Sequence, residues 1–410
     1  MGRAVDAERV IADLRELARR TSDEGGAQRL CWGAGWREAR EFLRELLAEI
    51  GLEPEVDEAG NAWAYLPGEA EPALAVGSHL DSVPNGGWLD GALGVMGAVG
   101  VLRAWAGADE PPPRTLALVD WADEEGARFG RSLFGSSAVA GTFDPAELAE
   151  ARDADGLAAP GVLAENGVAL DRVLESRSRL ERLGDYLELH IEQGPVLEAG
   201  GIRAAAVTGC VGVERLRFRI TGQASHAGTT PMDARRDAGL AAATAALRVE
   251  EIALAEGGVG TVGVMSFEPG IPTAVPGVAS LVVDLRHRRA DALERMLGSA
   301  RDRIQTAARE RCCEAAEEPV WRIEPIEFDP DLVRLAREAC ERITGTAYEL
   351  PSGALHDAAS MAPRMPTAMV FSPSLGGVSH APEEDTGEAD LAAAIEVFGA
   401  LVEGRITTAS

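Results

Sequence analysis

Apolar segments of strand length alternate with helical segments along much of the chain. The strand-like runs are residues 61–66, 73–76, 115–121 and 185–191. Helical periodicity precedes the first run, and an apolar helix follows the Gly-rich segment that begins at residue 77. Because helices that connect neighbouring strands make those strands parallel, this order predicts an α/β domain with a mixed, largely parallel sheet and helices on both faces.

The pattern changes after residue 210. A strand of alternating polarity, a long helix, two strands and a second long helix follow; their expected bounds are 213–220, 235–255, 259–267, 279–287 and 290–311, with a candidate closing strand at 321–326. Alternation of helix and strand then resumes, with a last helix from residue 388. The sequence therefore predicts a first domain in two parts, 1–210 and 328–410, and an inserted α+β sandwich at 211–327.

The charge of the chain excludes several classes of partner and of chemistry. With 39 basic and 67 acidic residues, its formal net charge is −28. Phosphate backbones and anionic membranes attract clustered cations, so we expect neither nucleic acid nor a membrane as a partner. All 39 basic residues are arginines. A chain without lysine has no Schiff-base, pyridoxal-phosphate or Walker-type lysine chemistry.

The cysteines and the first residues indicate a compartment. Five cysteines are an odd number without C-x-x-C spacing, and Cys312 and Cys313 are neighbours that do not easily bridge, so we expect reduced thiols. Residues 1–20 carry charges throughout, where a signal peptide needs an apolar core. No segment reaches the roughly 18 uninterrupted apolar residues of a membrane span. We therefore expect a cytoplasmic protein.

Chemically competent side chains follow the apolar runs, where α/β domains place their sites. His79 lies just after the second run, and Asp81 stands where it can hydrogen-bond the imidazole, although an isolated H-x-D is more often a polar turn. Asp90 lies on the Gly-rich loop, and a lone Asp-Gly is also common in turns. Glu124 and Glu125 follow the third run, where so much negative charge needs either divalent cations or a solvated loop.

Three further histidines are candidates. His190 lies within the fourth run, where a lone histidine is more often a satisfied core residue than a ligand. His380 follows an apolar strand and a Gly-Gly turn, and its alternative place is a helix-capping loop. His226 lies in the inserted segment without a nearby acid, which disfavours metal binding and leaves hydrogen-bond donation to a substrate or a structural role.

Taken together, these residues suit a pair of metal ions. Two histidines can bind one ion, a histidine and a carboxylate can bind the other, and one carboxylate can bridge them. The candidate ligands are His79, Asp90, Glu125, His190 and His380. This ligand mixture suits zinc or manganese, and two ions about 3.5 to 4 Å apart can activate water. Glu124, the remaining acid, is then the candidate general base.

Six ordered motifs carry a family resemblance that covers nearly the whole chain. They are GSHLDSVPNGGWLDGALGV, DEEGARFGRSLFGSSAVAG, ELHIEQGPVLE, GQASHAGTTPMDARRDA, PSGALHDAASMA and PTAMVFSPSLGGVSHAPEE. With them the chain resembles the M20 metallopeptidase-like amidohydrolases. Within these it looks like the hydantoinase/carbamoylase branch, which includes N-carbamoyl-L-amino acid hydrolases and allantoate amidohydrolases. The HIEQGPVLE block marks this branch, because His190 stands where the peptidases usually have a metal-binding carboxylate.

The resemblance implies two divalent metal ions per subunit, zinc, manganese or cobalt. The implied ligands are His79, Asp90 and His190 for the first ion, and Asp90, Glu125 and His380 for the second. Glu124 would act as the base, and Asp81 would orient His79. In this family the inserted domain is a lid that also forms the homodimer.

The resemblance also assigns substrate-binding residues. His226 would reach the partner subunit's active site and stabilise the tetrahedral oxyanion. Gln193 and Arg286 would bind substrate, the arginine by pairing with a carboxylate.

Three positions depart from the family pattern. Thr273 stands where asparagine is usual, Ser137 replaces the last residue of the usual GSR, and Leu355 replaces the second glycine of SGAGHDA. These departures concern the substrate, because the implied metal ligands are intact.

The predicted activity is hydrolysis of the ureido C–N bond of an N-carbamoyl-L-amino acid, a small molecule, to the L-amino acid, carbon dioxide and ammonia. The alternatives are an allantoate amidohydrolase, an M20 peptidase or aminoacylase, and a non-catalytic metal-dependent binding protein.

Overall fold

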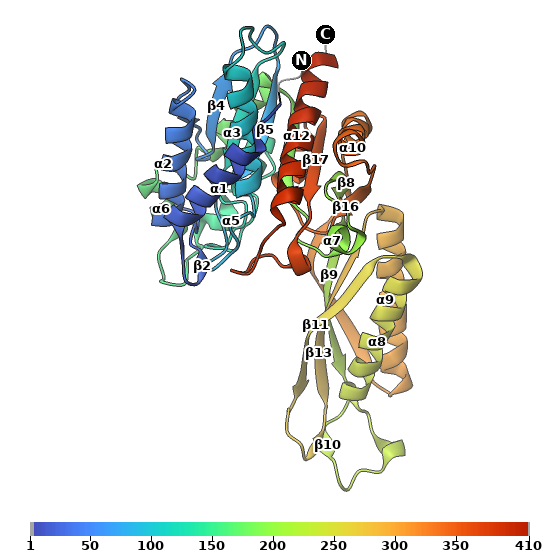
Figure 1. Ribbon diagram of the computed structural model, residues 1–410. Helices are drawn as coiled ribbons and strands as arrows, with labels where there is room; N and C mark the ends of the chain where they lie inside the picture. Colours follow the sequence, from blue (N-terminus) through green and yellow to red (C-terminus); the bar gives the residue numbers. More distant parts are fainter. Residues whose placement is uncertain (1–3, 409–410) are drawn as a thin grey trace. The chain divides into compact units, whose positions relative to one another are not determined.

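The computed structural model describes residues 4–408, and the chain forms two compact units (Figure 1). The first unit comprises the chain up to Thr208 and again from Glu327, and the second comprises Gly209–Ile326. These limits lie within two residues of the boundaries expected at 210/211 and 327/328. Between residues 4 and 408, no helix combines the length and the apolar character that crossing a membrane requires.

A nine-stranded sheet organises the first unit. The strands in sheet order are β15 (Ile326–Glu327), β8 (Ala205–Cys210), β17 (Thr367–Ser372), β7 (Leu183–Ile191), β5 (Ala73–His79), β6 (Leu116–Trp121), β4 (Ala62–Leu66) and β3 (Glu55–Val56), with β16 (Glu349–Ser352) beside β8. The central strands β17, β7, β5 and β6 are parallel, whereas β8 runs antiparallel to β17, β4 to β6 and β3 to β4. The predicted mixed α/β fold with a mostly parallel central sheet is confirmed.

Helices pack on both faces of this sheet. Gly97 of α3 (Ala92–Ala106) lies against Leu189 of β7, since a Cβ at Gly97 would be 3.0 Å from the leucine Cδ2. The preceding strand residue, Glu188, accepts a 3.0 Å hydrogen bond from the main-chain N–H of Ala358 in α11 (Asp357–Met361). Successive residues of a strand face opposite sides of the sheet, so α3 and α11 cover opposite faces.

The remaining helices of the first unit follow local sequence signals. They are α1 (Ala7–Thr21), α2 (Ala34–Ala48), α4 (Phe134–Ala140), α5 (Ala146–Ala149), α6 (Ala159–Glu165), α7 (Val196–Gly200), α10 (Pro330–Thr344) and α12 (Glu388–Thr408). Helix α1 begins after Asp6 because that side chain accepts the N–H of Arg9 at 3.0 Å. Glycines with positive φ at 156 and 167 lie between α5, α6 and the 3₁₀ helix η1 (Val173–Arg182) and separate these three helices.

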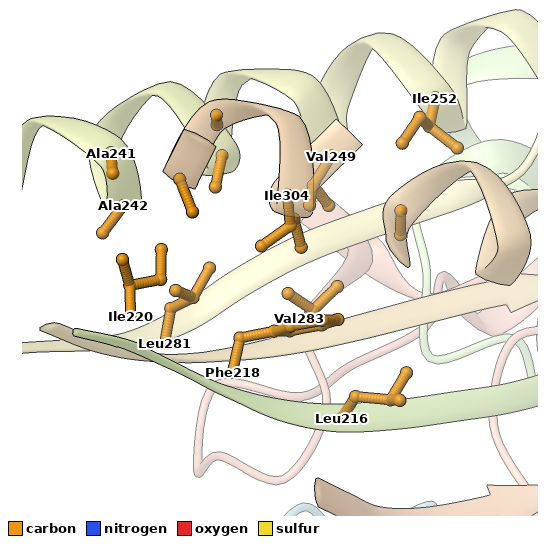
Figure 2. Close-up of a cluster of buried hydrophobic side chains, with 14 of the residues drawn as sticks. Leu216, Phe218, Ile220, Ala241, Ala242, Val249, Ile252, Leu281, Val283 and Ile304 are labelled. Carbon is orange, nitrogen blue, oxygen red and sulfur yellow. The ribbon is translucent and has the colours of Figure 1, made fainter. Parts of the chain in front are cut away.

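The second unit is a four-stranded antiparallel sheet with two long helices on one face (Figure 1). The sheet order is β11 (Val259–Glu268), β13 (Val278–His287), β9 (Gly212–Thr221) and β14 (Glu314–Ile323); the helices are α8 (Ala238–Glu256) and α9 (Ala290–Glu310). Alternate residues of β9 and β13 enter the core beneath these helices, and Leu216, Phe218 and Val283 are among them (Figure 2). The short strands β10 (Ser225–His226) and β12 (Ala274–Val275) pair separately.

The closing strand of this unit differs from the expectation. It begins at Glu314 rather than at 321, and residues 326–327 belong to the sheet of the first unit. Pro319 and the glutamates around it obscured the strand pattern in the sequence. The structure accommodates them because β14 is an edge strand whose register with β9 shifts between Pro319 and Trp321.

Gly77 lies where the central sheet has no room for a side chain. It belongs to β5, and a Cβ at this position would be 1.9 Å from the carbonyl oxygen of Val119 in β6. We expect Gly77→Ala to push these strands apart and to lower the free energy of unfolding by about 2 to 3 kcal/mol or more. Urea denaturation measures the change.

The matched control is Gly161→Ala in α6, where an added Cβ meets open space. This variant should be neutral or more stable by up to about 1 kcal/mol. Equal denaturation midpoints for the two variants would contradict the assigned strand packing.

Candidate metal centre and active site

The candidate residues gather at one edge of the parallel sheet. His79 is the last residue of β5, Glu124 and Glu125 follow β6, and His190 is near the end of β7. His380 lies on the loop after β17. Since the carboxyl ends of parallel strands meet at the same edge, the topology brings together residues that are about three hundred positions apart in sequence.

His79, Asp90 and His190 form the first cluster of potential metal ligands. The Nε2 atom of His190 is 3.2 Å from Asp90 Oδ1, and that of His79 is 3.8 Å from the same oxygen. The Nδ1 atoms face main-chain carbonyl oxygens, that of Asp81 at 3.1 Å for His79 and that of Ile191 at 2.9 Å for His190. A carbonyl oxygen accepts only, so each Nδ1 carries the proton and each Nε2 has a lone pair, which in His190 accepts the main-chain N–H of Gly91 at 3.3 Å.

Asp90, Glu125 and His380 form the second cluster. The Nε2 atom of His380 lies 3.2 Å from Asp90 Oδ2 and 3.4 Å from Glu125 Oε2. Asp90 therefore presents one carboxylate oxygen to each cluster. That division is the geometry of a carboxylate that bridges two ions.

The donor set fits divalent metal ions. Glu125 Oε1 is buried and accepts no hydrogen bond from the described residues, which leaves it available as a ligand. Imidazole nitrogens together with carboxylate oxygens match zinc and manganese. The expected sets of three ligands per ion, joined through Asp90, are thus compatible with the structure. Metal binding by these residues stays a prediction.

Glu188, His190 and His356 form a third group within ligand distance. Polar atoms of all three side chains already take part in hydrogen bonds within the protein. The Glu188 carboxylate accepts hydrogen bonds from Ser78 Oγ at 2.7 Å and from the N–H of Ala358 at 3.0 Å. His356 packs its ring 4.4 Å from that of His190. We interpret this group as polar support beneath His190.

Glu124 is placed for proton transfer. Its Oε2 is 3.8 Å from His79 Nε2, beside the first cluster, and the residue is 7% exposed. Burial raises the pKa of Glu124 well above its ordinary value, and nearby carboxylates, Asp357 first among them, add to the shift. A carboxylate with a raised pKa takes up a proton more readily than an ordinary glutamate, as a general base must.

Asp81 supports Glu124 and Glu125 more directly than it supports His79. Its carboxylate oxygens accept the main-chain N–H groups of Glu124 and Glu125, each at 3.2 Å. Its Oδ1 is 3.5 Å from His79 Nδ1, whereas its main-chain oxygen is nearer to that nitrogen. The sequence predicts that the Asp81 carboxylate orients His79. In the structure the main-chain carbonyl of Asp81 is the nearer partner of the His79 ring.

Three non-glycine residues at this edge have left-handed backbone conformations. They are Asp123, Gln193 and His380, with φ of 54°, 58° and 56°. Such conformations are uncommon away from glycine and cluster at functional sites.

Gln193 has an ordered side chain within the second cluster. Its Nε2 donates to Asp90 Oδ2 at 3.0 Å and to Ser379 Oγ at 3.2 Å. Its Oε1 is buried and has no hydrogen-bond partner among residues 4–408. The amide thus offers an acceptor for a substrate N–H group.

His226 and Arg286 lie in the second unit, so the sequence prediction joins residues of both units. His226 Nδ1 accepts the N–H groups of Gly228 at 3.1 Å and Thr229 at 3.2 Å. The neutral ring therefore carries its hydrogen on Nε2 and can donate a hydrogen bond from there. Arg286 donates from Nε to Asp284 Oδ1 at 2.8 Å.

The three departures from the family pattern have different surroundings. The carbonyl oxygen of Thr273 accepts the N–H of Ala227, next to His226, at 2.9 Å. Ser137 is buried, and its hydroxyl donates to the carbonyl of Phe134. Leu355 is half-buried and directly precedes His356. Thr273 and Leu355 thus adjoin candidate site residues.

Two residues of the site lay beyond sequence reasoning. Arg29 is fully buried, and its Nε donates to the carbonyl of Leu80 at 2.8 Å. Glu384 accepts the N–H of Asp90 at 3.0 Å. Arg29 stands about fifty positions before His79 without any motif, and Glu384 is one of two adjacent glutamates, so no pattern distinguished either residue.

Comparison with known proteins gives one consistent result. Residues 75–404 match the family model for peptidase family M20/M25/M40. The chain is 37% identical over 391 residues to an N-carbamoyl-L-amino acid amidohydrolase of Geobacillus stearothermophilus, and the alignment covers 95% of each protein. It is 34% identical over 390 residues to an allantoate amidohydrolase of Escherichia coli (strain K12), which covers 92% of each.

A solved structure has the same fold over nearly its full length. An amidase of the hydantoinase/carbamoylase family from Burkholderia multivorans matches with a TM-score of 0.89 at 33% identity, and 98% of each chain is covered.

The site generates a prediction about metal-free protein. Burial raises the pKa of Asp123 to about 8 and that of Glu125 to about 7, and the hydrogen bond to Asp90 raises the pKa of His380 to about 9. A raised pKa means that the folded state favours the protonated form. The resulting stability is complete below the unfolded-state pKa values and is lost as the pH rises through 7, 8 and 9.

Chelator-treated protein should therefore show a falling melting temperature between pH 6 and pH 9. Added zinc or manganese should raise the melting temperature more at pH 8.5 than at pH 6, because the ligands must be deprotonated. A melting temperature of the stripped protein that rises over this range would contradict the prediction.

Proposed function

The chain belongs to peptidase family M20/M25/M40 and to its hydantoinase/carbamoylase branch, and from this membership we propose that it hydrolyses N-carbamoyl-L-amino acids with two divalent metal ions. The coarser conclusion, a metal-dependent hydrolase of amide C–N bonds, follows from the family itself. The observation that carries the finer proposal is the division of the Asp90 carboxylate between two ligand clusters. We place the reaction in the cytoplasm, as the odd number of cysteines indicates.

Two ions per subunit, zinc, manganese or cobalt, would occupy the clusters. His79, Asp90 and His190 would hold one ion, and Asp90, Glu125 and His380 the other. Bound there, the ions would polarise the ureido carbonyl and lower the pKa of water.

Glu124 would move the protons. It accepts one proton from the attacking water and returns it to the nitrogen that leaves when the C–N bond breaks. One water molecule is consumed overall, and the products are the L-amino acid, carbon dioxide and ammonia. The pKa of Glu124, raised by burial, supports both the uptake and the return of the proton.

The remaining substrate contacts involve three side chains. Gln193 Oε1 would accept a ureido N–H, because its amide nitrogen already donates to Asp90 and Ser379. His226 Nε2–H would donate to the oxyanion in the partner subunit's site. Arg286 would pair with the substrate carboxylate.

The homodimer would form through the second unit. The exposed face of α8 carries Leu240, Leu247 and Leu254 at seven-residue spacing, and these are 40%, 64% and 77% exposed. The adjacent strand β11 is at the edge of its sheet and exposes Val259 and Val264. An apolar helix face beside an open strand edge favours a second copy of the chain as the partner.

Ammonia release tests the activity. The metal-stripped protein, reloaded with manganese, zinc or cobalt, should release ammonia from N-carbamoyl-L-amino acids and not from their D-forms. Glu124→Gln should keep its metal content and lose about 10²- to 10⁴-fold in kcat, because the base is removed while the ligands remain. Metal analysis and steady-state kinetics measure both effects.

The panel also includes β-ureidopropionate and allantoate. Release from allantoate alone would move the assignment to an allantoate amidohydrolase. Full activity of Glu124→Gln would refute the proposed role of Glu124 as the base. If the metal-loaded protein released ammonia from none of these compounds, the result would favour a non-catalytic binding protein.

The dimer is tested separately by sedimentation. The wild-type protein should sediment as a dimer, and Leu247→Glu should shift it to monomer, because a charge would enter the apolar interface. Leu157→Glu is the matched control, since Leu157 is 51% exposed on the first unit. A monomeric wild-type protein, or equal behaviour of both variants, would refute this interface.

A further inference from the structure

We propose that Glu384 is a positioning residue that fixes the backbone of Asp90 and the loop of His380, and that it thereby determines how tightly the second metal position binds its ion. The inference rests on the proposed two-metal function. Glu384 belongs to neither ligand cluster, and no described contact joins it to Glu124.

The segment between His79 and Asp90 has an unusual requirement. It is irregular, yet most of its residues are buried, so its main-chain polar groups need partners within the protein. Arg29 supplies partners for two of the segment's carbonyl groups, because the guanidinium donates to the carbonyls of Leu80 at 2.8 Å and Gly87 at 3.4 Å.

Glu384 supplies the partner for the N–H groups next to Asp90. Its Oε1 accepts the main-chain N–H groups of Leu89 at 3.1 Å and Asp90 at 3.0 Å. The residue is 1% exposed, so these bonds are made away from water. Two charge-assisted bonds on consecutive N–H groups fix the direction in which the Asp90 side chain leaves the backbone.

Close packing shows that this contact is specific. A Cβ at Gly87 would be 2.0 Å from Glu384 Cδ, so only glycine leaves room for the carboxylate. The loop and the glutamate therefore fit each other.

The second oxygen of Glu384 reaches the loop of His380. Its Oε2 accepts the hydroxyl of Ser379 at 2.8 Å, and Ser379 Oγ is also 3.3 Å from Asp90 Oδ2. One carboxylate thus holds the backbone of Asp90 and the residue next to His380.

This arrangement acts unequally on the two metal positions. Two ligands of the second position, Asp90 and His380, lie on the segments that Glu384 holds. In the first position, His79 and His190 belong to strands β5 and β7, which fix them independently. Loss of Glu384 should therefore weaken the second position more than the first.

Metal titration by calorimetry, with manganese and with zinc as probes, tests the inference. Wild-type protein should bind two ions per chain. In Glu384→Ala, the weaker ion should lose affinity by about 10- to 100-fold while the tighter ion changes little. Glu384→Gln should recover most of the loss, because its amide oxygen can still accept both N–H groups.

Glu383→Gln is the matched control. Glu383 is the neighbouring glutamate, is exposed, and should leave both affinities unchanged. If Glu384→Ala does not fold, as judged by its melting curve, Ser379→Ala removes one link of the same network and should weaken the second ion several-fold.

The outcomes separate the two proposals. Two ions in wild type with unchanged affinities in folded Glu384→Ala, or in Ser379→Ala where the first variant is unfolded, would overturn the positioning role alone. Equal weakening of both ions would overturn its selectivity for the second position. Wild-type protein that binds fewer than two ions would overturn the two-metal function and this inference with it.

Discussion

Burial of several carboxylates at one edge of a parallel sheet is the constraint on which the first unit depends. Ionised carboxylates repel one another strongly away from water, so each needs a cation or donated hydrogen bonds. Asp120 has the guanidinium of Arg40 at 2.7 Å, and Asp81 has two main-chain N–H groups. Asp90 and Glu125 have histidines and, in our proposal, metal ions. The parallel strands place these carboxylates close together, and the cations and donated hydrogen bonds offset the repulsion between them.

Much of this arrangement could be predicted from the sequence. Apolar runs located the central strands, and the topology of a parallel sheet then placed His79, Glu125 and His190 at a common edge. Fold membership rests on the same ordered motifs, which is why the mixed α/β architecture was predictable. The edge strand β14 was placed wrongly, because Pro319 and its neighbouring glutamates satisfy the needs of an exposed edge rather than those of a buried strand.

The supporting residues could not be predicted in the same way. Arg29 and Glu384 act on main-chain groups of a loop, and any sequence of that loop offers the same N–H and carbonyl groups. No side-chain pattern therefore records the contact, and only the folded path of the loop creates it. The same reason applies to Asp81, whose carboxylate serves two backbone N–H groups where the sequence suggested the His79 ring.

The inserted unit leaves and rejoins the first sheet at neighbouring strands, β8 and β15. The N–H of Phe328 donates to the carbonyl of Thr208 at 3.1 Å, so the chain on either side of the insertion is already joined by a hydrogen bond. A short loop from Thr208 to Glu327 would close the first unit without rethreading a single strand. The second unit is therefore an insertion that the strand order of the first sheet does not require. Replacing the inserted module would leave the candidate metal ligands of the first sheet in place, whereas in our proposal it would change substrate binding, oxyanion stabilisation and assembly, which depend on His226, Arg286 and the face of α8.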